Sequence, residues 1–166
     1  DHPETNENNN SYTGTFEVLA GSTGLPDLKI VDDWKGSGVP VKVEPFPFEL
    51  TDITAGDSQV FMQTELENIG SGSALDAELN LLITTSEGNV WIDNSVGALN
   101  VYANAKANYA WSELVPDDFP VGTYTYTFTV DPDNKISETD ENNNSYTGTF
   151  EVSEYQETCF TASGYS

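Results

Sequence analysis

The chain has 166 residues, with 28 aspartates and glutamates against five lysines, no arginine, and a formal net charge of −23. This length suits one domain with ragged ends. Nucleic acid is excluded as a partner because phosphate binding needs clustered Lys and Arg, and an anionic membrane surface is disfavoured for the same reason. Divalent cations, or a salty exterior that screens self-repulsion, suit this charge better.

Histidine and cysteine chemistry has almost no material, because His2 and Cys159 are the only residues of their kinds. An intrachain disulfide, the usual zinc sites and histidine-based catalysis are therefore not expected. Glu113 with Asp117 and Asp118 could suggest a glycosidase pair, but nothing in the sequence sets two carboxylates across a cleft. No apolar run reaches membrane-spanning length. We expect neither an enzyme nor a membrane-inserted protein.

The first element in chain order is a strand that the sequence contains twice. Residues 4–18 and 138–152 are identical at fourteen of fifteen positions, with Asn6 standing where Asp140 does. The second half of each copy alternates, which predicts a half-buried β-strand. In the N-terminal copy, residues 1–18, one face of this assembly strand carries Tyr12, Gly14, Phe16 and Val18. A chain that starts in mid-repeat is interpreted as a processed or excerpted piece.

An orphan strand cannot bury its apolar face alone. We therefore expect the assembly strand to pair with another copy of the chain or with a neighbouring repeat unit. Addition to an open sheet edge beside residues 145–152 is favoured over displacement of those residues, because displacement gains little new burial. Addition of this kind runs head to tail and would build a filament.

Residues 19–26 form a linker with two glycines and a proline, and a domain follows over residues 27–152. Leu28 and Ile30 mark its first strand. Residues 39–50 alternate but contain three prolines, so they should form an edge strand or an extended crossing piece.

Alternation then predicts strands over 60–67, 77–84 and 123–130, with turns at 54–57, 68–73 and 86–89. A short strand at 90–92 should turn at 94–97, and residues 101–111 should form one long strand. Residues 116–120 predict a loop, and an acidic loop at 131–144 leads into the second copy of the repeated strand. Residues 153–166 form a C-terminal tail. Strands at this spacing, with no helical stretch, predict an all-β protein: an immunoglobulin-like antiparallel β-sandwich of about seven to nine strands, with an extra N-terminal strand segment.

Three stretches resemble a known family. They are Leu25-Pro-Asp-Leu-Lys-Ile30, Glu67-Asn-Ile-Gly-Ser-Gly-Ser-Ala74, and the closing run from Gly122 to Asn143 with its Asp131-Pro-Asp-Asn134 turn. Over residues 25–152 the chain resembles the CARDB domain, the cell adhesion related domain found in bacteria. The resemblance implies an immunoglobulin-like module, often in tandem, in secreted and surface proteins of bacteria and archaea. It implies no catalysis and identifies no ligand.

The acidic loop concentrates hard oxygen ligands, the type that calcium prefers. The candidate calcium ligands are Asp131, Asp133, Asn134, Glu138, Asp140 and Glu141. The loop is not an EF-hand, because Lys135 occupies a ligand position. The alternative is that Asp and Asn cap turns and hydrogen-bond their own backbone. Asn9 and Asn143 stand in glycosylation sequons, which we interpret as incidental in so Asn-rich a chain.

Aromatic residues offer a second kind of site. Trp34, Trp91 and Tyr102 could form a platform for stacking sugars, although such residues more often pack in a core or hairpin. The sequence thus predicts a non-catalytic, prokaryotic extracellular or cell-surface module that acts through assembly, as a filament or in a tandem array. A carbohydrate-binding module that recognises surface polysaccharide is the alternative.

Overall fold

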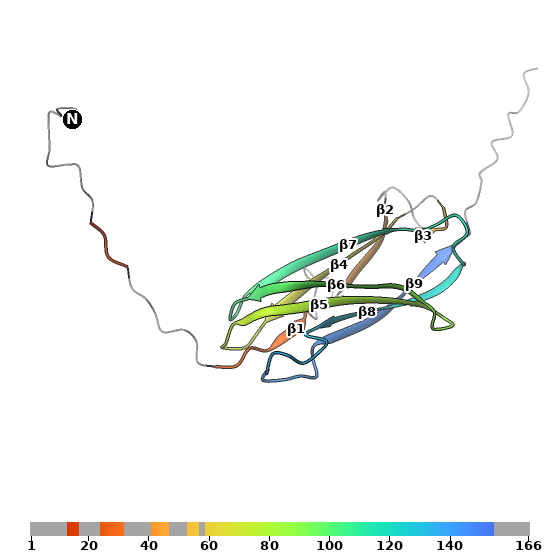
Figure 1. Ribbon diagram of the computed structural model, residues 1–166. Coiled ribbons are helices and arrows are strands. Elements are labelled where there is room, and N and C mark those ends of the chain that lie inside the picture. Colours follow the sequence, from red (N-terminus) through yellow and green to blue (C-terminus); the bar gives the residue numbers. More distant parts are fainter. Residues whose placement is uncertain (1–12, 17–23, 32–40, 47–52, 57–58, 155–166) are drawn as a thin grey trace, which may run out of the picture.

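The computed structural model describes residues 13–16, 24–31, 41–46, 53–56 and 59–154. Within these ranges the chain forms nine strands in two sheets that pack face to face (Figure 1). The predicted all-β, immunoglobulin-like sandwich is confirmed.

The first sheet is built around β4 (Gln59–Asn68). β7 (Lys106–Leu114) pairs with one edge of β4 over nearly its whole length. β1 (Leu28–Ile30) and β2 (Val41–Phe46) therefore share the opposite edge, where they pair with successive parts of β4. β2 is thus the edge strand that the prolines predict, with Pro45 opposite Val60.

The second sheet has the order β3-β9-β8-β5-β6. Its strands are β3 (Ile53–Thr54), β5 (Ala74–Thr85), β6 (Val90–Val101), β8 (Gly122–Val130) and β9 (Ser145–Ser153). β3 pairs in parallel with only Val152 and Ser153 of β9, and the other pairs are antiparallel. Among the described strands, none pairs with the outer edge of β9 before Val152.

The alternation read from the sequence does place side chains in the core. Val60, Met62, Thr64 and Leu66 of β4 are all buried. The matching faces of β5 and β8 are buried too: Ala77, Leu79, Leu81, Ile83, Tyr124, Tyr126, Phe128 and Val130. The Tyr124 hydroxyl donates to the Pro120 carbonyl (2.8 Å), the kind of corner that immunoglobulin-like sandwiches form at the start of this strand.

Two boundaries differ from the prediction. The expected turn at 94–97 is part of β6, where Asn94, Ser95 and Val96 pair with β5. The turn lies instead at 102–105, so the predicted long strand over 101–111 is divided between the end of β6 and β7. Asn104 has a φ of 58°, a left-handed conformation that Asn tolerates better than most residues.

The chain enters the sandwich at one end and β9 finishes at the other (Figure 1). We call the first the proximal end; it holds residues 24–27, the β4–β5 loop (69–73), the β6–β7 turn (102–105) and the acidic loop (131–144). The distal end holds the β5–β6 turn (86–89), the β7–β8 loop (115–121) and the end of β9.

Gly148 explains why the repeated strand carries a glycine. It lies opposite Tyr126 on β8, and a Cβ at this position would overlap the tyrosine Oη and stand 2.5 Å from Cζ. The tyrosine ring thus occupies the space that a side chain at position 148 would need.

We predict that Gly148→Val destabilises the sandwich by about 1–3 kcal/mol, because Tyr126 must leave its packing position. Thermal unfolding should show the melting temperature fall by several degrees. Gly97→Ala is the matched control, because Gly97 lies in β6 with nothing within 4 Å of its added Cβ. Equal melting temperatures for the Gly148→Val variant and the wild type would contradict the prediction.

Candidate functional site

The proximal end is held together around residues 24–27, which we call the lead-in segment. Its carbonyls accept three backbone hydrogen bonds: Leu25 from Gly72 (2.9 Å), Pro26 from Thr139 (2.9 Å) and Asp27 from Ile69 (2.8 Å). The lead-in segment is therefore clamped between the β4–β5 loop and the acidic loop.

The glycines of the β4–β5 loop make this clamp possible. A Cβ at Gly70 would stand 2.5 Å from the Asp27 nitrogen, and one at Gly72 would overlap the Gly24 oxygen and stand 2.8 Å from the Leu25 carbonyl carbon. Real side chains do not fit at such distances from backbone. The Asn-Ile-Gly-Ser-Gly stretch that carried the family resemblance is thus a backbone-packing surface for the lead-in segment.

Asn68, at the end of β4, satisfies all of its hydrogen-bonding capacity while fully buried. Its Oδ1 accepts from the backbone nitrogens of Asp27 (3.1 Å) and Gly70 (3.0 Å). Its Nδ2 donates to the carbonyls of Gly72 and Val101, both at 2.8 Å. From the sequence, Asn68 was interpreted only as a turn residue. Its position at the end of an alternating strand, before two glycines, is the sequence feature that could have indicated this buried role.

Glu138 links the acidic loop to β1. Its side chain is buried, and its two oxygens accept from the Leu28 backbone nitrogen and from Asn144 Nδ2 (2.9 Å). Burial raises the pKa of the Glu138 carboxyl to about 6, although both hydrogen bonds act in the opposite direction. The nearby carboxylates of Glu141 and Asp131 raise it further.

Asp131 organises the start of the acidic loop. Its carboxylate is buried and accepts from the backbone nitrogens of Lys135 (3.0 Å) and Ile136 (2.8 Å). Its own backbone has a φ of 47°, and its carbonyl accepts from the Asn134 nitrogen (3.0 Å). This is the turn chemistry weighed against calcium in the sequence.

The carboxylates of Asp133, Asp140 and Glu141 also have protein partners, and Asn134 is exposed. Asp133 forms an ion pair with Lys135 (2.8 Å), and Glu141 accepts from the Glu138 nitrogen (2.9 Å). Asp140 is exposed, and its carboxylate accepts from the backbone and side chain of Asn142, which lowers its pKa. Among the described residues, no group of three or more His, Cys, Asp or Glu side chains is placed to hold a metal ion.

Two amide oxygens at this end have no hydrogen-bond partner among the residues that the structure describes. Asn143 donates through Nδ2 to Asp27 (2.8 Å) and Asn144 to Glu138, but the Oδ1 of each is buried and unpaired. Sequence reasoning did not name either oxygen as a ligand. The Asn143 amide nitrogen that would carry a glycan at this sequon already donates to Asp27, and a glycan would leave it a single N–H.

The aromatic residues do not form a platform. Trp91 packs into a cluster with Phe119, Tyr124 and Phe150, with ring centroids 4.4–6.4 Å away. Tyr102 is exposed at the other end of β6, and eleven residues of strand separate the two by roughly 35 Å. Trp34 lies outside the described residues. The structure therefore does not bring Trp91 and Tyr102 into one sugar-binding surface.

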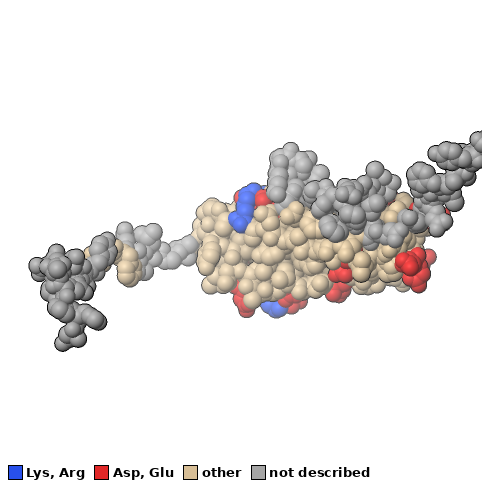
Figure 2. Space-filling view, turned by 90° about the horizontal axis from the view of Figure 1, so that it is seen from above, with Lys and Arg blue, Asp and Glu red and all other residues tan. Residues whose placement is uncertain are grey.

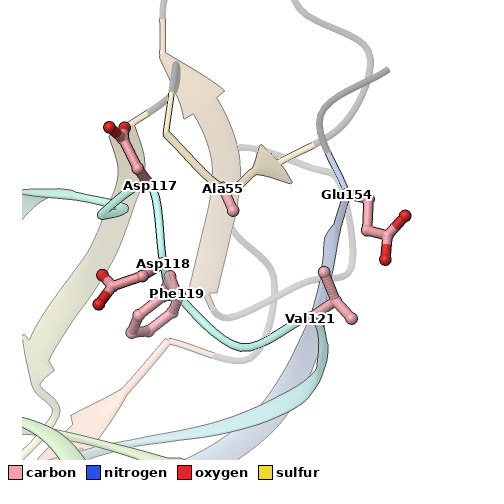
Figure 3. Close-up of a pocket in the computed structure, with 6 residues that line it drawn as sticks. All are labelled: Ala55, Asp117, Asp118, Phe119, Val121 and Glu154. Atoms are coloured by element: carbon pink, nitrogen blue, oxygen red, sulfur yellow. The ribbon is translucent and has the colours of Figure 1, made fainter. Parts of the chain in front are cut away.

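Of the suggested glycosidase carboxylates, Asp117 and Asp118 border a shallow hollow at the distal end, whereas Glu113 lies on β7 and does not line it. The hollow is lined by Ala55, Asp117, Asp118, Phe119, Val121 and Glu154. Figure 3 shows the carboxylates of Asp117, Asp118 and Glu154 pointing in different directions, with none facing another across the hollow. The hollow does not have the arrangement that paired-carboxylate hydrolysis requires.

Only part of the assembly strand can be placed. Residues 13–16 belong to no strand and lie apart from the sandwich, with the Phe16 side chain 88% exposed (Figure 1). Tyr12 and Val18 lie outside the described residues, as do residues 19–23 of the linker.

The two sheets, the tyrosine corner and the strand order define the class: an immunoglobulin-like β-sandwich. The sequence matches the CARDB family over residues 49–148, and the chain belongs to that family. No curated protein matches the chain significantly. Among the described residues, no helix is long and apolar enough to cross a membrane.

Solved structures share the fold at low sequence identity. The CARDB domain of the PF1109 protein from Pyrococcus furiosus, solved in complex with di-metal ions, is 18% identical, with a TM-score of 0.54 over 80% of this chain and 96% of that one. The C-terminal domain of wzt is 16% identical, with a TM-score of 0.54 over 80% and 77%. A Bacteroides fragilis protein assigned as a β-galactosidase reaches 0.53 at 16% identity, but only 17% of its chain is covered.

CARDB is a non-catalytic, adhesion-related domain family, as the sequence resemblance implied. The partial match to the β-galactosidase concerns the sandwich fold alone, because it covers 74% of this chain but a small share of that protein.

We predict that Glu138→Gln changes how stability depends on pH. The folded-state pKa of Glu138 lies above its ordinary value, so the folded protein holds this proton more tightly than the unfolded chain. The ionised carboxylate therefore costs stability as pH rises from about 4.5 through 6. Relative to the wild type, the Glu138→Gln variant should gain melting temperature over this range. Asn144 can turn its amide so that its free Oδ1 accepts from the new side chain.

Melting temperatures of both proteins between pH 4 and 8 provide the check. Glu87→Gln is the matched control, because it removes a carboxylate from an exposed turn at the distal end. A difference between the Glu138→Gln variant and the wild type that stays constant across this pH range would refute the prediction.

Proposed function

We propose that this chain is a non-catalytic structural and adhesion module of a prokaryotic extracellular or cell-surface protein, and that it works in a series of like sandwiches. Residues 4–18 close a neighbouring sandwich in that series, as residues 138–152 close this one. The partner of the chain is thus another unit of the same kind.

The single observation that carries this proposal is that the residues of the 138–152 motif have specific roles inside the sandwich. Glu138 holds β1, Asn143 holds Asp27, and Gly148 makes room for Tyr126. The corresponding residues of the N-terminal copy are unchanged: Glu4, Asn9 and Gly14. An alternating strand needs none of these details unless it enters the same surroundings, so the motif fits the closing position of a second CARDB sandwich.

Strand addition to the open edge of a sheet is the alternative arrangement. The outer edge of β9 has no strand partner among the described residues before Val152, and strand addition there would bury Tyr12, Phe16 and Val18. Burial of three such side chains is worth roughly 5–9 kcal/mol before ordering costs. Addition of this kind does not close on itself and would produce a filament. Strand addition would require the alternating pattern of residues 11–18, but it would not require a glycine at position 14.

A two-unit chain distinguishes the two arrangements. It has an extra copy of residues 19–137 directly before residue 4, so that residues 4–18 can close the added sandwich. We expect calorimetry to show an unfolding enthalpy about twice that of the single chain, because each domain contributes in proportion to its size. Gly14→Val should destabilise one sandwich as Gly148→Val destabilises the other. An unchanged enthalpy would rule out the closing role.

Filaments of the single chain in electron micrographs would instead favour strand addition. Those filaments should vanish when residues 1–18 are deleted, with the sandwich still folded, and should persist in the Gly14→Val variant.

We further propose that the acidic loop binds calcium weakly and stiffens the start of β9. The supporting observations are the oxygen-rich loop and the two buried amide oxygens without partners, a situation that an ion or water often explains. The Pyrococcus furiosus CARDB domain was solved with di-metal ions, which makes a metal reasonable for this fold. Binding would require the loop carboxylates to exchange backbone partners for the ion.

Millimolar calcium should raise the melting temperature at matched ionic strength, since a ligand that binds only the folded state stabilises it by mass action. Ten times the dissociation constant would give about 1.4 kcal/mol. Asp133→Ala should weaken the response, whereas Asp118→Ala, at the distal end, should retain it. Superimposable melting curves with and without calcium would exclude the site.

A further inference from the structure

Among the side chains of residues 24–154 that the structure describes, the exposed large apolar ones lie at the two ends of the sandwich. The described part of the domain has seven of them: Leu25, Ile69, Leu75, Val90, Tyr102, Leu114 and Val121. The outer faces of the sheets are mostly polar, as in the exposed Thr127–Thr147 pair, and the large apolar residues Phe61 and Leu82 on these faces are half-buried. An isolated exposed apolar residue needs no explanation, but their restriction to two opposite ends does.

Four of the seven belong to the proximal end. Leu25 (51% exposed) and Ile69 (46%) sit on the clamped lead-in segment and the loop that holds it. Leu75 (58%) directly follows Ala74, and Tyr102 (63%) directly follows Val101. Ala74 and Val101 pair with each other where β5 and β6 reach the proximal end. All four are carried by backbone that is hydrogen-bonded in place, so the surface is preformed.

The other three belong to the distal end. Val90 is the first residue of β6, Leu114 is the last of β7, and Val121 directly precedes β8; they are 50–68% exposed. Acidic side chains accompany them, and Figure 2 shows a group of acidic residues at this end of the molecule. Asp117, Asp118 and Glu154 are the acidic residues that border the distal hollow.

The length of the linker brings two such ends together. The repeated strand ends at Val18 and the clamped lead-in segment holds Leu25, so seven residue steps join them. Fully extended, they span at most about 25 Å. A sandwich closed by residues 4–18 therefore has its distal end within that distance of this proximal end.

We propose that the proximal end of this sandwich packs against the distal end of a second unit of the same kind. Leu25, Ile69, Leu75 and Tyr102 form one side of the contact, and Val90, Leu114 and Val121 form the other. This rests on the proposed function, because the partner is the neighbouring sandwich of the series. The contact is heterologous and repeats head to tail, so it stiffens a line of units.

A short linker holds the two ends at an effective concentration in the millimolar range, so the contact needs little affinity of its own. Between separate chains it is correspondingly weak. Acidic residues at both ends oppose it at low ionic strength, and salt should strengthen it.

The test is sedimentation equilibrium of the full chain, up to about millimolar concentration and in high salt. We expect concentration-dependent association. A proximal variant (Leu75→Ser with Tyr102→Ser) and a distal variant (Leu114→Ser with Val121→Ser) should each weaken it roughly tenfold or more. Ala110→Ser, exposed in the middle of β7, is the control and should associate like the wild type.

An equimolar mixture of the proximal and distal variants is the decisive sample. Each retains one intact end, so the mixture should form dimers but nothing larger. A wild-type chain that is monomeric throughout, or variants that associate like the wild type while melting normally, would overturn the inference.

Deleting residues 1–18 separates this inference from the proposed function. Association that survives the deletion and responds to the end variants supports packing of the ends. Association that is lost on deletion but indifferent to the end variants belongs to the repeated strand and overturns the end contact, and the unfolding enthalpy of the two-unit chain then decides whether the proposed series stands.

Discussion

The hydrogen bonds that two buried polar side chains make to the incoming chain determine the organisation of the proximal end. Asn68 accepts from the Asp27 nitrogen, and Glu138 accepts from the next residue, Leu28. β1 is only three residues long, so its own ladder with β4 offers little to hold it. Buried side-chain acceptors that bind the backbone N–H groups of so short a strand stabilise it, because a buried N–H group without a partner would be costly in free energy. The direction in which the chain enters the domain follows from these contacts.

The same contacts connect stability with the acidic loop. Glu138 is both the partner of β1 and a buried carboxylate near Glu141 and Asp131, so its ionisation has a structural cost. Most carboxylates of the loop order their own backbone, as those of Asp131 and Asp140 do. The loop therefore has a function in the fold whether or not it also receives a cation. A calcium site would have to compete with these internal partners, which is why weak affinity is expected.

Several features of the sequence were sufficient to predict the architecture. Alternation located β4, β5, β8 and β9 because their inner faces are mostly apolar and their outer faces mostly polar. The same reasoning failed at 94–97, where Asn, Ser and Gly resemble a turn. There Asn80 donates to Ser95 (3.1 Å) and Asp93 (2.9 Å) across the strands, so polar residues support the sheet from outside. Local composition cannot distinguish a polar outer face from a turn.

The sequence by itself determined the class of fold, the repeated closing strand, the family and the absence of material for histidine or zinc chemistry, because each depends on residue type and local order. Only the tertiary structure decided which polar groups meet. It gave the carboxylates of the acidic loop their backbone partners, left two amide oxygens without any, and separated Trp91 from Tyr102 along β6. It also gathered exposed apolar residues from distant parts of the chain at two ends. Contacts of this kind join residues far apart in sequence, so no local pattern records them.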